Sequence, residues 1–371
     1  MSFKQKLAVL LTGLSALLFL NAPDVNACTG IRLTAENGAV VYGRTMEWGE
    51  FNLHSRVAVV PRGYAFTGLT PDGYTGKKWK AAYGFVALDM LQEDVFADGM
   101  NERGLAVGLF YHPGFESYNV YDKRKASDTI TAVDVPAYIL SQCATVDEAK
   151  AAMKKVRVVP VVDAHIGMAV DAHWMVTDVA GNSLVIEYAD HTLKLYDAPL
   201  GVITNAPRYD WHLTNLRNYV NLSPVAMPAK KIEDMNFAPL GVGSGMIGLP
   251  GDFTPPSRFI RAVAWTQTHR PLPDAGEAVY ELFRILDNFN VPLTAAEGAQ
   301  STSGKLKDMR SSTQWTTAWD LSERVLYFHT QDDRRVRKVD MNRINFAKST
   351  ITHLPLDETG AQDVKDITPA D

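Results

Sequence analysis

The sequence predicts two stacked antiparallel β-sheets enclosed between outer layers of helices. Short segments in which apolar and polar residues alternate fill most of the first two hundred residues, as expected for half-buried strands. Apolar residues at helical spacing recur at 133–156 and at 257–288, and two more strand-like segments follow residue 311. Strands in two groups, with helices between them in the chain, favour two sheets packed face to face.

The first residues are typical of a signal peptide. Lys4 and Lys6 precede an apolar run from Leu7 to Leu20, and residues 25–27 form the small-x-small pattern that a signal peptidase recognises. The run is shorter than the ~20 residues that a membrane-spanning helix needs. We therefore expect cleavage after Ala27, a periplasmic or secreted protein, and no membrane attachment once residues 1–27 are removed.

The mature chain is expected to form one domain over residues 28–353, followed by a polar tail at 354–371. It opens with a hairpin whose strands, 31–34 and 40–45, flank an Asn-Gly turn. Further strands are predicted at 56–60, 95–97, 105–111, 174–178, 183–188, 193–196 and 201–204. Helices are predicted at 133–140, 146–156, 257–268 and 276–288, and a last hairpin joins 312–320 to 324–330. A capping box at 145–148 marks the start of the second helix.

Composition excludes some classes of function. The formal net charge is −5, so no basic field is available for nucleic acid. The chain has two cysteines, and Cys143 lies in an apolar helical segment, where we expect a buried thiol. The nine histidines form no His-Glu-x-x-His pair, so His165 with His173, or His112 with His212, would bind a metal only if the fold happened to bring them together. No metal or cofactor is implied.

Cys28 is the strongest candidate for chemistry. Cleavage before this residue would leave a thiol nucleophile and a primary amine on one residue, and an α-amino group with a pKa of ~7.7–8.0 can act as a base near neutral pH. Lipidation of the same cysteine is the alternative, and it would make the chain a lipid-anchored binding protein. Asn26 fits a lipidation site poorly, and a strand pattern follows Cys28 without a polar tether.

Two charged residues stand at the end of the strand that should pair with Cys28. The guanidinium of Arg44 beside a thiol favours the thiolate. The carboxylate of Glu47 could hold the mature amine in place. A solvated surface charge is the ordinary role for either residue type, but their place in the nucleophile's own hairpin favours the active site.

The chain resembles the choloylglycine hydrolase family, which contains bile salt hydrolases and penicillin V acylases. Each matching motif is short, but together they recur in order along nearly the whole mature chain. The matching residues are Cys28-Thr29, Arg44-Thr45-Met46-Glu47, Tyr83-Gly84-Phe85-Val86, Phe96 to Leu105, Thr204-Asn205-Ala206-Pro207, Leu249-Pro250-Gly251-Asp252 and Ser257-Arg258-Phe259. The resemblance implies an α+β, four-layer αββα sandwich, the N-terminal-nucleophile hydrolase fold.

The resemblance also implies catalytic roles. Cys28 matches the nucleophile, Arg44 its neighbouring cation, and Arg258 the arginine that completes the polar network. Asn205 matches the oxyanion-hole asparagine, with a backbone N–H near residue 110 as a second donor. Glu47 stands where the family usually has an aspartate, which keeps the charge but changes the reach of the side chain.

The expected substrate is a small-molecule amide with an apolar acyl group. Bile salt hydrolases tend to have an asparagine where Phe110 and Tyr111 follow Gly108-Leu109, so the chain looks most like the penicillin V acylases of Gram-negative bacteria. Trp48, Phe110 and Tyr111 are therefore predicted to line the substrate pocket. Penicillin V and N-acyl homoserine lactones are the favoured substrates, with conjugated bile salts as the alternative. The family is often tetrameric, so the resemblance is consistent with a homotetramer, but no residue pattern in the sequence fixes the oligomeric state.

Overall fold

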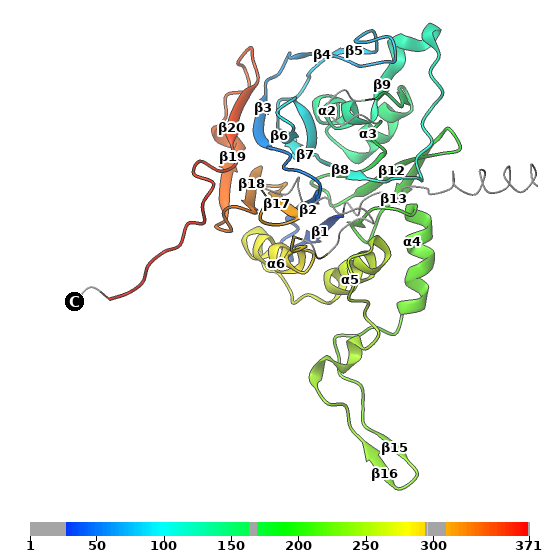
Figure 1. Cartoon of the computed structure of the whole chain (residues 1–371), viewed down its shortest axis with the longest axis vertical. Coiled ribbons are helices and arrows are strands. Elements are labelled where there is room, and N and C mark those ends of the chain that lie inside the picture. Colours follow the sequence, from blue (N-terminus) through cyan, green and yellow to red (C-terminus); the bar gives the residue numbers. More distant parts are fainter. Residues whose placement is uncertain (1–26, 163–168, 294, 296–308, 370–371) are drawn as a thin grey trace, which may run out of the picture.

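The structure is a computed structural model that describes residues 27–162, 169–293, 295 and 309–369. The predicted signal segment, apart from Ala27, lies outside these residues. Two large antiparallel sheets lie face to face, with helices on both outer faces (Figure 1). The first sheet has six strands in the order β14-β1-β2-β17-β18-β19 and the second has eight in the order β13-β12-β11-β8-β7-β6-β3-β20. This is the predicted αββα arrangement.

The six-stranded sheet contains β1 (Cys28–Thr34), β2 (Val40–Glu47), β14 (Val202–Ile203), β17 (Thr313–Asp320), β18 (Val325–Thr330) and β19 (Arg337–Asp340). The eight-stranded sheet contains β3 (Arg56–Val60), β6 (Phe85–Met90), β7 (Val95–Asn101), β8 (Ala106–Tyr111), β11 (Ala172–Thr177), β12 (Ser183–Ala189), β13 (Thr192–Asp197) and β20 (Thr352–Pro355). Three short pairs stand apart: β4 (Ala65–Thr67) with β5 (Lys78–Lys80), β9 (Thr129–Thr131) with β10 (Arg157–Val159), and β15 (Lys230–Ile232) with β16 (Met235–Phe237).

Helices cover each sheet from outside. α2 (Val135–Gln142) packs on β7 and β8, with α3 (Val146–Met153) beside it. α5 (Pro255–Thr268) and α6 (Ala275–Asp287) pack on β1, β2 and β17, and α4 (Tyr209–Leu216) lies against α5. The helices are amphipathic, so one apolar core forms between the sheets and under α5 and α6, and a second forms under α2 and α3. None of the described helices is long and apolar enough to cross a membrane.

The predicted first hairpin is confirmed and places Cys28. Gly38 has a φ of +86°, which an Asn-Gly turn requires, and β1 pairs with β2 in a register that sets Cys28 opposite Met46. β1 is an interior strand, because β14 pairs along its other edge. Gly30 and Ile31, just after Cys28, are therefore paired on both sides.

The C-terminal boundary differs from the prediction. Residue 354, where the tail was expected to begin, lies inside β20, which pairs with β3. Leu356 is buried, and Asp357 accepts hydrogen bonds from Thr330 Oγ1 at 2.8 Å and Arg337 Nη1 at 2.6 Å. A mixed polar and apolar segment without clear alternation can still complete a sheet edge, and this one does.

Candidate active site

Cys28 is the first residue of β1 and faces the space between the two sheets. It is 3 % exposed, and its Sγ lies 2.9 Å from Nη2 of Arg44 on the neighbouring strand. The Cα register aligns Arg44 with Gly30, two residues along from Cys28, so both side chains leave the sheet on the same face. The hairpin alone therefore brings the predicted nucleophile and its cation together.

The guanidinium of Arg44 is wholly buried and fully occupied. Its Nη1 donates to the carbonyls of Ala97 and Leu109, and its Nε donates to the carbonyl of Thr45 at 3.2 Å. The Cζ atom of Arg44 lies 4.3 Å from the ring centroid of Phe110. These contacts compensate the buried charge and aim one N–H at the sulfur.

Phe110 is therefore not a pocket residue. Side chains alternate along β8, so Leu109 and Tyr111 project to one face and Phe110 to the other, where it is fully buried beneath Arg44. The prediction placed Phe110 and Tyr111 in the pocket together, but adjacent residues of a strand cannot share a face. Tyr111 alone of the two lines the pocket.

Asn205 and Arg258 meet the backbone of Cys28 from the helical side. Arg258, from α5, donates through Nη2 to Asn205 Oδ1 at 2.6 Å and through Nη1 to Thr29 Oγ1 at 2.9 Å and to the carbonyl of Cys28. Burial lowers the pKa of Arg258 to about 10, so its charge persists at neutral pH. Asn205 Oδ1 also accepts from the nitrogen of Cys28 at 2.8 Å. That nitrogen is a peptide nitrogen here and would be the α-amine of a chain cut after Ala27.

The orientation of the Asn205 amide follows from its partners. Arg258 can only donate, so the atom that it contacts must be the oxygen. The Nδ2 group then donates to the carbonyl of Tyr111 at 2.6 Å. An amide nitrogen carries two hydrogens, so one N–H remains for a substrate atom.

Glu47 is buried at the end of β2 and is only partly paired. Its Oε1 accepts from Thr313 Oγ1 at 3.2 Å, and its Oε2 has no hydrogen-bond partner among the described residues. Burial raises its pKa to about 7, although Arg258 and Arg44 act in the opposite direction. A buried carboxyl oxygen without a hydrogen bond lowers the stability of the fold. Glu47 Oε2 could accept a hydrogen bond from an α-amine at Cys28, which the uncut chain does not have.

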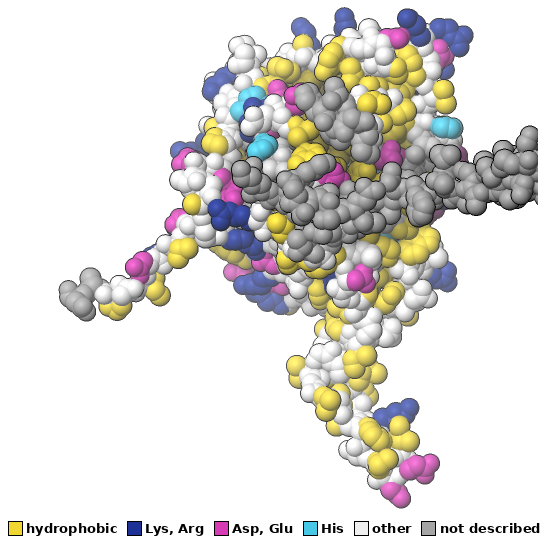
Figure 2. Space-filling model, viewed as in Figure 1, with side chains coloured by type: hydrophobic (Ala, Val, Ile, Leu, Met, Phe, Trp, Pro, Cys, Tyr) yellow, Lys and Arg dark blue, Asp and Glu magenta, His cyan; other side chains and the backbone are white. Residues whose placement is uncertain are grey.

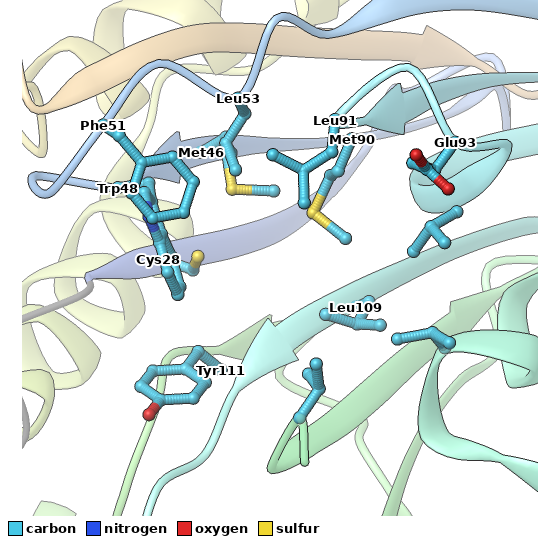
Figure 3. A pocket seen from close by; sticks show the side chains of 13 residues that line it. Cys28, Met46, Trp48, Phe51, Leu53, Met90, Leu91, Glu93, Leu109 and Tyr111 are labelled. Atoms are coloured by element: carbon cyan, nitrogen blue, oxygen red, sulfur yellow. The ribbon is translucent and has the colours of Figure 1, made fainter. Parts of the chain in front are cut away.

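An apolar pocket opens beside Cys28 (Figure 3). About 750 Å³ of space lies between its atoms, part of which is open to solvent. Trp48 and Tyr111, both predicted, stand close to Cys28 and meet edge to face with ring centroids 5.7 Å apart. Of the thirteen described residues that line the pocket, Glu93 alone carries a charge, and it lies at the end remote from Cys28.

Several lining residues were missed in the sequence. They come from the segment after β2, from the end of β6 and from the turn that follows it, and include Leu53, Met90, Leu91 and Glu93. The signal in the sequence was weak. Phe51 and Leu53 follow Trp48 closely, and the apolar residues Met90 and Leu91 stand where a turn would usually be polar. By contrast, Cys143 is buried as expected, its pKa raised by burial to about 12, and neither it nor Cys28 forms a disulfide.

The sequence and the fold both match known proteins. The family model of the linear amide C–N hydrolases, choloylglycine hydrolase family, matches residues 28–360. A bile salt hydrolase/transferase from Clostridium perfringens is 31 % identical over 86 % of this chain and 93 % of its own length. A penicillin V acylase from Pectobacterium atrosepticum is 25 % identical over 83 % of this chain and 78 % of its own. Overall identity therefore does not place this chain nearer to the acylase than to the bile salt hydrolase.

Solved structures agree with this assignment. A variant of the conjugated bile acid hydrolase from Clostridium perfringens superposes with a TM-score of 0.78 and 27 % identity, over 92 % of this chain and all of that one. The penicillin V acylase from Agrobacterium tumefaciens gives 0.71 and 25 %, over 89 % and 92 %. The chain thus belongs to the choloylglycine hydrolase family of linear amide C–N hydrolases and has the N-terminal-nucleophile hydrolase fold.

Proposed function

We propose that this protein is an N-terminal-cysteine amidohydrolase that acts after cleavage before Cys28. The observation that carries the proposal is the position of Cys28 Sγ, which borders an apolar pocket and lies 2.9 Å from Arg44 Nη2. The α-amine takes the thiol proton, the thiolate attacks the amide carbonyl, and the same amine protonates the leaving group. A thioester remains, and water hydrolyses it.

The remaining site residues support these steps. The free N–H of Asn205 Nδ2 is proposed to donate to the oxyanion, and a backbone N–H near Phe110 to supply the second donor. Glu47 is proposed to accept from the mature amine, which gains the hydrogens that the peptide nitrogen of the uncut chain lacks. Arg258 keeps Asn205 Oδ1 in place as the acceptor of the same amine.

We propose an apolar acyl group as the main determinant of substrate choice, with penicillin V and long-chain N-acyl homoserine lactones as preferred substrates. Trp48 and Tyr111 present aromatic faces next to Cys28, which suit an aryl or alkyl chain. Conjugated bile salts are the second candidate, because bile salt hydrolases are among the most similar relatives. Phe110 does not line the pocket, so of the aromatic pair that distinguishes this chain from bile salt hydrolases only Tyr111 can act against a bile salt.

The test compares kcat/KM for penicillin V, a long-chain acyl homoserine lactone and glycocholate on a chain that begins at Cys28. Cys28→Ala should abolish turnover, and Cys143→Ala, the matched control, should leave it unchanged. A version that keeps Ala27 through a noncleavable leader should be inactive. Full turnover by that version would overturn the mechanism, and a clear preference for glycocholate would make the protein a bile salt hydrolase.

Export to the periplasm or beyond belongs to the same proposal. Intact mass spectrometry of the exported protein should give the mass of a chain starting at unmodified Cys28. A diacylglyceryl adduct would instead indicate the lipid-anchored binding protein.

We also propose self-association through the arm formed by residues 220–249. It projects from the body between α4 and α5 and ends in β15 and β16, with apolar side chains along its length (Figures 1 and 2). Val220, Leu240 and Val242 are each more than four-fifths exposed, which a second copy of the chain would relieve. Light scattering should show a tetramer for the full chain and a smaller species when residues 229–238 are replaced by a short Gly-Ser loop.

A further inference from the structure

Three buried histidines surround the segment that carries Asn205. His112 directly follows β8, His173 lies in β11 and His212 lies in α4. His173 Nε2 lies 2.9 Å from the carbonyl oxygen of Thr204, and His212 Nε2 lies 2.9 Å from that of Asn205 itself. The carbonyl oxygens of the two peptide groups that flank the Asn205 Cα are thus both hydrogen-bonded by imidazoles.

The partners fix the tautomer of each ring. A carbonyl oxygen only accepts, so Nε2 carries the hydrogen in both His173 and His212. The Nδ1 of His173 then faces Glu187 Oε1 at 3.0 Å. The same carboxyl oxygen accepts from the backbone N–H of Tyr209 at 2.9 Å, and Tyr209 is the first residue of α4. Glu187 therefore joins the two histidine-bearing elements.

A metal site is the competing interpretation of this cluster. His112, His173 and Glu187 offer three ligand atoms that lie within 4.8 Å of one another. The imidazoles of His112 and His173, however, stack with centroids 4.1 Å apart and planes only 6° from parallel. Their lone pairs lie in parallel planes and cannot converge on one ion, and the Nε2 of His173 is already committed to Thr204. The geometry fits a hydrogen-bonding network instead.

Burial keeps both imidazoles of this network neutral. Burial lowers the pKa of His212 to about 4 and that of His173 well below its ordinary value, so both rings are neutral at physiological pH. The ring of His212 also stacks on Phe259, with centroids 4.8 Å apart, next to Arg258 in α5. A neutral donor held from two sides is a stable support for the backbone that it contacts.

We propose that His173 and His212, coupled through Glu187, are positioning residues that hold the backbone of Asn205 so that its side chain faces both Cys28 and Arg258. None of the three touches the reacting atoms; each acts through Asn205. The inference rests on the proposed amidohydrolase function and adds a supporting layer to its oxyanion and amine site. His173 and His212 hold the backbone on both sides of the Asn205 Cα. A shift of that backbone would therefore move Oδ1 and Nδ2 of Asn205 together.

The test replaces His212 by Gln and by Asn. Gln can present its Nε2 near the position of the imidazole Nε2 and still reach the Asn205 carbonyl, whereas Asn is too short. We expect H212Q to stay within about threefold of the unchanged protein and H212N to lose roughly 10- to 100-fold in kcat with little change in KM, because small displacements of catalytic groups cost that much. Alkylation of Cys28 by iodoacetamide should be equal in both variants, since Arg44 is not disturbed.

A double-mutant cycle separates positioning from general destabilisation. If His212 acts through Asn205, then H212N in an Asn205→Ala background should cost almost nothing further, although H212N alone costs much. Equal losses in both backgrounds would overturn the inference, as would equal kcat for H212Q and H212N. Glu187→Leu, which loses the contacts with both His173 and Tyr209, should also lower kcat. Absence of amide hydrolysis by the unchanged mature protein would reject the proposed function instead.

Discussion

Arg44 shows how much structure a single buried charge requires. Three carbonyl oxygens, an aromatic face and the sulfur of Cys28 surround its guanidinium. Asp98, also fully buried, provides the nearby acidic group, with its Oδ2 accepting from Thr317 Oγ1 and Trp319 Nε1, both at 2.7 Å. Burial raises the pKa of Asp98 to about 6, against the influence of Arg44, so the carboxyl is mostly ionised at pH 7.

Replacing Arg44 by Gln should slow alkylation of Cys28. The substitution removes the positive charge that stabilises negative charge on the attacking sulfur, so iodoacetamide reacts more slowly, by roughly tenfold for each 1.4 kcal/mol of lost stabilisation. Stopped-flow or mass-spectrometric alkylation rates measure this without any substrate. Arg62→Gln, an exposed arginine on the other sheet, is the control, and an unchanged rate for R44Q would remove Arg44 from the activation of the thiol.

Replacing Asn205 by Ala should lower kcat and leave substrate binding nearly unchanged. An oxyanion donor acts as charge develops, and loss of one costs ~2.7–4 kcal/mol, a hundred- to thousandfold in rate. Because Asn205 also accepts from Cys28 N and Arg258, the melting temperature must be measured alongside the kinetics. A rate loss explained wholly by unfolding would leave Asn205 with a structural role alone.

At the scale of elements, local patterns predicted the hairpins and helices that surround the site. The Asn-Gly turn, the capping box at Thr145 and the amphipathic spacing of α5 and α6 are each visible within a few residues. α4 and the arm with β15 and β16 were not predicted. α4 has few buried residues, and the strands of the arm have none, so no apolar period marks them in the sequence.

Gly43→Ala should destabilise the sheet that carries Cys28. A Cβ at this position in β2 would overlap the carbonyl oxygen of Thr317 and lie 2.7 Å from Leu282 Cδ2 of α6. Overpacking of this kind typically costs ~1–3 kcal/mol, measurable by urea unfolding. Gly49→Ala, whose Cβ would lie 3.4 Å from the nearest atom, Ser312 Oγ, should cost much less. Equal midpoints for the two variants would contradict the packing argument.

At the scale of the whole molecule, the part of the active site outside the first hairpin was predictable only through the resemblance. Cys28 and Arg44 meet because they share a hairpin, which spacing alone indicates. Asn205 and Arg258 reach Cys28 from 177 and 230 residues away, and no local pattern measures such a separation. Phe110, by contrast, could have been placed correctly from the sequence. Adjacent residues of a strand face opposite sides, so Phe110 and Tyr111 could not both line the pocket.

Stability should decline from pH 7 to 8.5, with Glu116 as the main cause. Burial raises the pKa of Glu116 to about 9, above its ordinary value of 4.5, so the folded protein keeps a proton that the unfolded chain has released. The stabilisation is complete below pH 4.5 and is lost as the pH rises towards 9, by about 1.4 kcal/mol per pH unit for one proton. Between pH 5 and 6.5, buried neutral histidines such as His212, whose pKa is lowered, have the opposite slope and offset it.

Thermal unfolding across this range measures the effect. Glu116→Gln, which keeps the size and a hydrogen-bonding amide, should flatten the decline above pH 7. Glu277→Gln, on the exposed face of α6, should not change the slope. A decline that persists in E116Q would assign it to another group.

Because the Ala27–Cys28 peptide bond is buried in the folded chain, cleavage at this bond has to precede folding of β1. Ala27 is 1 % exposed and Cys28 3 %, and β1 pairs with β2 from Cys28 onward and with β14 at Gly30 and Ile31, so a peptidase could not reach this bond once β1 is in place. The predicted cleavage after Ala27 therefore requires a chain in which β1 has not yet paired with its neighbours. On the proposed mechanism, a full-length chain that folds before the cut would stay inactive, and only chains cut before β1 pairs would hydrolyse amides.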